Sequence, residues 1–64
     1  MTIFTINKCD DEGGTEVSVF TSPEKAALAF DTMWIQFFER LVLETHEEND
    51  EGVFIITDTK SRGA

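Results

Sequence analysis

The feature that most constrains the fold is the stretch from Ser22 to His46, the only segment long enough to form a substantial helix. Its start carries three helix signals: Ser22 suits the N-cap, Pro23 suits the first helical position, and Glu24 places negative charge in the first turn. No Gly or Pro interrupts residues 25–45. We therefore expect one long helix over Ser22–His46 that covers a small sheet.

Apolar side chains recur along this helix at steps of three and four residues, as on a buried helix face. They are Ala27, Phe30, Trp34, Phe37, Phe38 and Leu41, with Met33 at the edge. We expect them to form most of the core, so that Trp34→Ala unfolds the domain or nearly so. A second row, Leu28, Ile35 and Val42, repeats at sevens. This seam is either the edge of a long helix that wraps over the sheet or a surface for self-association or partner docking.

Three other segments predict β-strands by their β-branched, aromatic or alternating residues. They are Thr2–Asn7, Thr15–Thr21 and Val53–Thr57. The Lys8–Gly14 turn contains two glycines and joins the first two strands in a hairpin. The remaining segments are an acidic loop at Glu47–Gly52 and a frayed polar tail at Lys60–Ala64.

The order strand, strand, helix, strand predicts one small α+β domain over residues 1–64. The simplest sheet has three antiparallel strands in the order 2-1-3, with the helix laid on one face by a right-handed crossover. This ββαβ arrangement is a truncated ferredoxin-like fold. It leaves the other sheet face uncovered, and the strands carry apolar residues for both faces.

The net charge of −8 argues against direct binding to nucleic acid or to an anionic membrane, and favours a basic partner. The single cysteine, Cys9, excludes an internal disulfide and favours a reducing, cytoplasmic setting. Residues 1–7 are too short and too polar for a signal peptide or a transmembrane run. We expect a cytoplasmic monomer or weak dimer.

The predicted topology gathers acidic side chains at one pole, because the hairpin turn and the loop after the helix lie at the same end. The members of this acidic pole are Asp10, Asp11, Glu12, Glu44, Glu47, Glu48, Asp50 and Glu51. Carboxylates at a helix C-terminus oppose the helix dipole, and such a conflict is expected at functional sites. The acidic pole is therefore interpreted as a partner-binding surface, and the alternative is a solvated loop that maintains solubility.

Other chemistry has little support in the sequence. The runs Asp10-Asp11-Glu12-Gly13 and Asn49-Asp50-Glu51-Gly52 lack the ligand spacing of a calcium loop, so no metal is expected. His46 is the only histidine, and no motif places a nucleophile beside it. No glycine-rich phosphate loop leads from a strand into a helix. We expect neither an enzyme nor a cofactor.

In its length, acidity and single α+β domain, with the hairpin Asp10-Asp11-Glu12-Gly13-Gly14 and the acidic stretch Glu44–Glu51, the whole chain resembles small phage-encoded anti-CRISPR proteins. In particular it resembles acidic inhibitors of type I systems, those of type I-C above all. The resemblance implies binding to a CRISPR effector complex in the host bacterial cytoplasm and blockage of target DNA recognition as an acidic DNA mimic. The alternative is a small interaction module, antitoxin- or adaptor-like, that docks through an apolar helix or sheet face.

Overall fold

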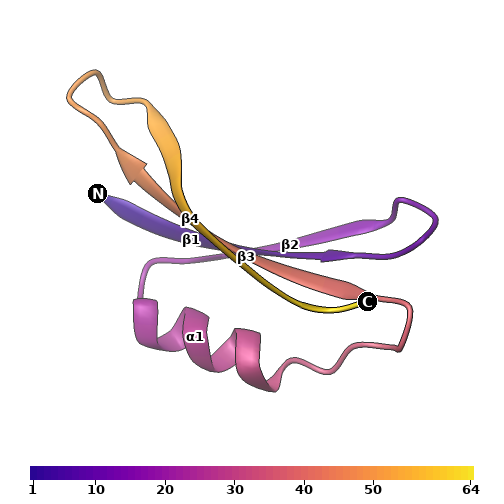
Figure 1. Cartoon of the computed structure of the whole chain (residues 1–64). Helices are drawn as coiled ribbons and strands as arrows, with labels where there is room; N and C mark the ends of the chain where they lie inside the picture. The colour runs from indigo at the N-terminus through magenta and orange to yellow at the C-terminus, as the bar shows by residue number, and fades with distance from the viewer.

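The computed structural model describes residues 1–64 as an α+β fold with one helix on one face of a four-stranded antiparallel sheet (Figure 1). The elements are β1 (Thr2–Cys9), β2 (Thr15–Phe20), α1 (Pro23–Thr32), β3 (Arg40–Glu48) and β4 (Phe54–Gly63). The sheet order is β2-β1-β3-β4. The predicted α+β class, the β1–β2 hairpin and the single helix on one face are confirmed. The predicted three-stranded sheet is wrong, and a ferredoxin-like arrangement is not confirmed.

Helix α1 begins where the sequence predicts but ends much earlier than His46. Ser22 is the N-cap, and its Oγ accepts a hydrogen bond of 3.3 Å from the backbone N–H of Lys25. The helix stops after Thr32, and residues 33–39 form an irregular connection instead of about two more turns. In that connection Glu39 turns the chain back, because its carboxylate accepts a hydrogen bond of 2.7 Å from the N–H of Gln36.

The second half of the expected helix is strand β3. Its residues pair with β1 in the register Leu43 to Ile6 and Leu41 to Lys8. Leu41 and Leu43 face the helix while Val42 and Glu44 face the other way, as the two-residue period of a strand requires. Leu41, Val42 and Leu43 follow one another directly, so their side chains suit the two faces of a strand better than the single apolar face of a helix.

The C-terminal residues also differ from the prediction. The expected tail, Lys60–Ala64, is mostly the second half of β4, and Val53–Thr57 contributes only its first half. The expected third strand thus pairs with β3 and not with β1, which corrects the order 2-1-3. Gly63 adopts φ +101°, and a Cβ there would approach the carbonyl oxygen of Glu39 to 2.5 Å, so this close approach requires glycine.

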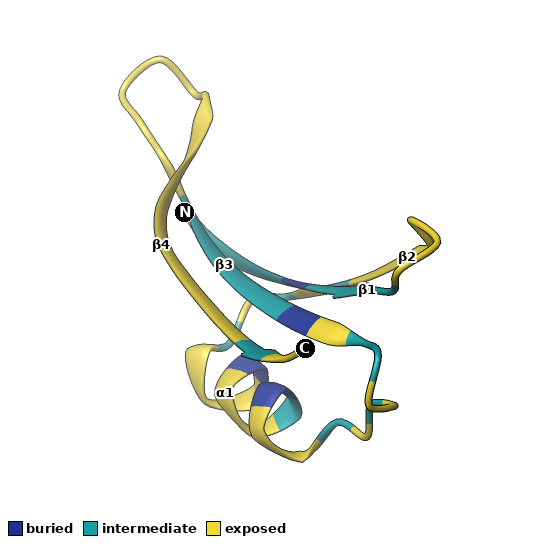
Figure 2. Cartoon of the chain, turned by 45° about the vertical axis from the view of Figure 1, so that its right-hand side comes forward, coloured by how far each residue is buried: buried dark blue, intermediate teal, exposed yellow.

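The hydrophobic core lies between α1 and the sheet and is very small (Figure 2). Only Ile6, Ala26, Phe30 and Leu41 are buried, and Phe30 is the one large helix side chain among them. The rest of the predicted stripe is not core: Trp34 is 73% exposed and Phe37 is 92% exposed. They lie in the connection after α1, where no helix turns them toward the sheet.

The Leu28/Ile35/Val42 seam does not exist as a continuous surface. Leu28 lies on the exposed side of α1, and Ile35 lies in the connection, where it packs against the core. Val42 belongs to β3 and faces away from the helix. A heptad repeat places its residues on one side of a helix, but only while the helix is continuous. Helix α1 ends before Ile35, the second member of the seam.

Arg62 of β4 links the C-terminal end of α1 to the sheet by hydrogen bonds. Its Nε donates a hydrogen bond of 2.6 Å to the carbonyl oxygen of Phe30, and Nη2 of the same guanidinium donates to the carbonyl oxygen of Met33. The guanidinium carbon also lies 5.8 Å from the centre of the Phe30 ring. The last carbonyls of a helix need donors and its dipole favours a cation there, yet the last turn of α1 contains no basic residue. Arg62, on strand β4, supplies both the hydrogen-bond donors and the positive charge.

We expect Arg62→Ala to lower the free energy of unfolding by about 1.5–3 kcal/mol, because charge-assisted hydrogen bonds to part-buried carbonyls are lost. Arg62→Lys keeps the charge but not the two-pronged geometry, and should fall between the alanine variant and the wild type. Urea unfolding followed by circular dichroism measures both. A wild-type midpoint for Arg62→Ala would show that the guanidinium does not hold the helix.

A matched pair of aromatic substitutions tests where the core lies. Phe30→Ala should unfold the protein or nearly so, since burying an aromatic ring in a core is worth about 3–5 kcal/mol. Trp34→Ala should change the free energy of unfolding by no more than about 0.5 kcal/mol, as for other surface substitutions. Thermal melts compare the stabilities of the two variants directly. If Trp34→Ala were the more destabilising change, the result would support the long helix expected over Ser22–His46.

Candidate functional site

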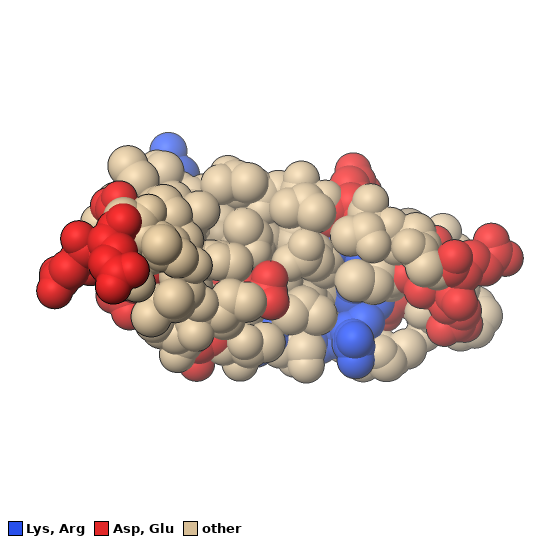
Figure 3. All heavy atoms as spheres, turned by 90° about the horizontal axis from the view of Figure 1, so that it is seen from above, with Lys and Arg blue, Asp and Glu red and all other residues tan.

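The acidic residues of the predicted pole do not lie together; apart from Glu44, they are divided between two opposite ends of the molecule (Figure 3). In the β1–β3 register, Cys9 pairs with Arg40 while Thr2 pairs with Glu47. The β1–β2 tip therefore lies at one end and the β3–β4 tip at the other end of a molecule 40 Å in its longest dimension. The single acidic pole is thus wrong, because it required residues 40–46 to be helical and to reverse the direction of the chain.

Both tips are built by the same five-residue loop. The first is Asp10-Asp11-Glu12-Gly13-Gly14, and the second is Asn49-Asp50-Glu51-Gly52-Val53. In each, the first residue's Oδ1 accepts hydrogen bonds of 2.8–3.0 Å from the N–H groups of the third and fifth residues. In each, the fourth residue is a glycine with φ near +80°. Asx side chains and glycine are the residues that such turns require.

This loop chemistry divides the acidic residues by role. Asp10 is a turn residue whose carboxylate is occupied by backbone N–H groups. The second and third residues of each loop make no hydrogen bond that shapes the turn, and they are exposed. These freely exposed acids are Asp11 and Glu12 at the first tip and Asp50 and Glu51 at the second.

Three other predicted site residues lie on β3, and two of these have partners within the chain. Glu44 lies in the middle of the open sheet face, where its Oε1 accepts hydrogen bonds from Asn7 at 3.1 Å and from Thr5 at 3.4 Å. His46 lies 3.7 Å from the same oxygen, which gives this histidine a structural position in the sheet. Glu48 lies 3.5 Å from the N-terminal amine of Met1.

Glu47 is exposed near the second tip, whereas Glu44 lies far from either tip, so the acidic side chains form no single surface. No three His, Cys, Asp or Glu side chains are arranged so that they could hold a metal ion. Helix α1 lacks the length and apolar character that crossing a membrane needs.

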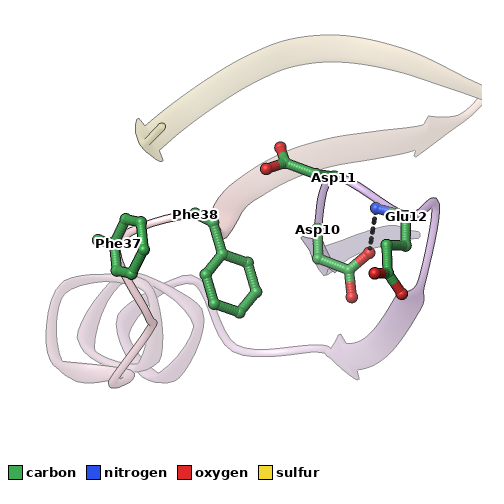
Figure 4. A pocket seen from close by; sticks show the side chains of 5 residues that line it. All are labelled: Asp10, Asp11, Glu12, Phe37 and Phe38. Atoms are coloured by element: carbon green, nitrogen blue, oxygen red, sulfur yellow. Dashed lines mark hydrogen bonds between the residues drawn. The ribbon is translucent and has the colours of Figure 1, made fainter.

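The first tip forms a pocket with two aromatic rings, which the sequence alone did not indicate. The pocket measures about 430 Å³ and is lined by Asp10, Asp11, Glu12, Phe37 and Phe38. The two rings lie edge to face, with centroids 5.4 Å apart and planes at 89°, beside the carboxylates of the tip (Figure 4). Phe37 and Phe38 had been assigned to the core because of their helical spacing. Their position opposite Asp10 depends on the turn at residues 36–39, which no sequence motif marks.

Aromatic rings beside carboxylates suit a cationic group, because a ring face attracts a cation and a carboxylate pairs with it. The volume lies within the range of about 300–1,000 Å³ that is typical of ligand pockets, and accommodates a lysine or arginine side chain. The nearest basic residues do not fill it: Lys8 pairs with Glu39 at 3.8 Å, and Arg40 lines a neighbouring hollow beside Asp11.

Comparisons with known proteins add no relative to this description. No protein-family model, no curated protein and no solved structure matches the chain.

Proposed function

We propose that this chain is an acidic inhibitor that binds a basic nucleic-acid-binding surface of a type I CRISPR effector complex and blocks recognition of target DNA as a DNA mimic. The net charge of −8 supports a basic partner, because opposite charge steers association. Surfaces that hold phosphates do so with Arg and Lys, and both residues also pair with carboxylates. An acidic protein can therefore occupy the surface that DNA needs.

The observation that carries this proposal is the pocket at the first tip, where the exposed carboxylates of Asp11 and Glu12 adjoin the exposed ring of Phe37 and the half-buried ring of Phe38. Phe37 is 92% exposed, and leaving an aromatic ring in water has no benefit for folding. Exposed aromatic residues are typical of binding surfaces, where they bury a large area at a small entropic cost. We assign the pocket to an Arg or Lys of the partner, with Asp11 and Glu12 as the carboxylates that pair with it.

The second tip is the weaker candidate although it carries the same Asp-Glu pair. No aromatic pocket adjoins it, and Glu48 beside it already pairs with the N-terminal amine. The two loops therefore differ in their surroundings and not in their own chemistry. That difference provides a matched control, because equal charge can be removed from the same positions of the same loop at either end.

We expect Asp11→Asn with Glu12→Gln to weaken competition against target DNA by about tenfold or more, since two charge-assisted contacts are lost. Asp50→Asn with Glu51→Gln removes the same net charge and should cost much less. Asp10 stays in both variants because it shapes its turn. The measurement is displacement of labelled target DNA from a purified type I-C effector complex, beside a thermal melt of each variant.

Equal loss in the two variants would show that net charge alone matters and would overturn the pocket assignment. Inhibition that neither variant weakens would overturn the mimic proposal itself. Binding should also weaken as salt rises, because steering between complementary charges is screened. Affinity that does not respond to salt would favour the alternative, an interaction module that docks through apolar residues.

The aromatic half of the pocket has its own test. Phe37→Ala should reduce affinity for the same complex severalfold and leave the melting temperature unchanged, because the ring is exposed. Leu28→Ala is a control, since Leu28 is also an exposed apolar side chain but lies on α1, outside the pocket. If both alanine variants bind like the wild type, the pocket does not contact the partner.

A further inference from the structure

Strand β4 is a long edge of the sheet with no strand on its outer side. It is ten residues long, lies outermost in the order β2-β1-β3-β4, and all of its residues except Arg62 are exposed. An edge strand presents a row of unpaired N–H and C=O groups, and natural proteins often block such a row with proline, a short strand, a bulge or charged side chains. β4 contains no proline, and the opposite edge, β2, has only six residues.

The charges on β4 are of both signs and have no ion-pair partner in the chain. Asp58 and Lys60 lie two residues apart, opposite Thr45 and Leu43 of β3, so both lie on the sheet face that α1 covers. None of the ion pairs within the chain involves either residue. The Lys60 ammonium instead lies 5.3 Å from the centre of the Phe30 ring. A strand carrying both signs at this spacing is complementary to an antiparallel copy of itself.

We propose that β4 pairs with β4 of a second copy of this chain, antiparallel about a two-fold axis through Thr59, which joins the two sheets into one of eight strands. A two-fold axis perpendicular to the sheet keeps both helices on one face. It therefore pairs residues of the same face, with one residue on the axis. With Thr59 on the axis, Asp58 lies opposite Lys60 of the second copy, and the contact occurs twice.

The charges select this register among its neighbours. An axis one residue earlier sets Asp58 against Asp58 of the second copy. An axis one residue later sets Lys60 against Lys60 and Asp58 opposite Arg62, whose guanidinium is already bound to the carbonyl oxygens of Phe30 and Met33. Like charges directly opposite each other on neighbouring strands are destabilising, whereas opposite charges are favourable. The register shift between β3 and β4 leaves Thr57 without a partner on β3, two residues before the proposed axis. Regular pairing is therefore centred on residues 58–60, the segment that carries both charges.

The proposal is independent of the CRISPR-inhibitor function, because the residues it uses lie on the edge strand and not in the pocket of the first tip. It concerns a different partner: a second copy, held mainly by backbone hydrogen bonds. Backbone pairing supplies affinity in strand addition, and the side chains choose the register.

Charge reversal with rescue tests it. Sedimentation equilibrium of the wild type at increasing concentration should show a monomer–dimer equilibrium. Asp58→Lys or Lys60→Asp alone should weaken the dimer by about tenfold or more, since each change turns both opposite-charge pairs into like-charge pairs. The double variant, Asp58→Lys with Lys60→Asp, should recover dimerisation. Circular dichroism checks folding, and recovery in the double variant excludes misfolding as the cause of the single losses.

A cross-linking experiment places the axis. In a Cys9→Ser background, Thr59→Cys should form a disulfide-linked dimer under mild oxidation, because residue 59 lies opposite residue 59 of the second copy. Thr15→Cys, an exposed position on the opposite edge strand β2, should remain a monomer. The proposal is overturned if the wild type stays monomeric at millimolar concentration, if the double variant fails to recover, or if the β2 cysteine cross-links as readily as residue 59.

Discussion

The contact between Arg62 and the end of α1 is the interaction on which the rest of the structure depends. The core consists of Ile6, Ala26, Phe30 and Leu41, and Phe30 is the only large helix side chain in it. A ten-residue helix is marginal on its own, so its stability comes from packing against the sheet. Arg62 donates to the carbonyl oxygens of Phe30 and Met33 and lies close to the Phe30 ring, so it fixes the helix where its one large side chain is buried. The last strand of the chain therefore completes the core that the first strands begin.

So small a core leaves the second sheet face, both hairpin tips and the edge strand β4 exposed. Much of the acidity follows from turn chemistry: each tip needs an Asx residue first and glycine fourth, and the Asp-Glu pair between them faces water. Glu44 belongs to a polar network with Asn7 and Thr5 on the open sheet face. What turn chemistry does not explain is the pocket that Phe37 and Phe38 form with the carboxylates of one tip only. That asymmetry is why we assign partner binding to the first tip.

The sequence predicts local features well and their assembly poorly. Ser22 as N-cap, the β1–β2 hairpin and the exposure of Asp11 and Glu12 follow from short-range chemistry, which acts within a few residues. The end of α1 was misplaced because the aromatic residues of an irregular connection happen to follow a helical spacing that continues to Leu41. The second half of β4 was missed because its alternation of Thr, Asp, Lys, Ser and Arg shows no hydrophobic signal; contacts with β3 and α1 determine it. The misplaced end of α1 produced the single acidic pole, and it also hid the pocket beside Phe37.

The claim that residues 40–48 form a strand, so that the acidic tips lie at opposite ends, can be measured as one distance. Spin labels at Glu12→Cys and Glu51→Cys, in a Cys9→Ser background, mark equivalent positions of the two loops. Pulsed electron–electron double resonance should give a single distance close to the 40 Å length of the molecule when the labelled chain is diluted with unlabelled protein to suppress contacts between copies. A distance below half that length would bring the two tips to one end. That result would contradict the four-stranded sheet and restore a helix through residues 40–46.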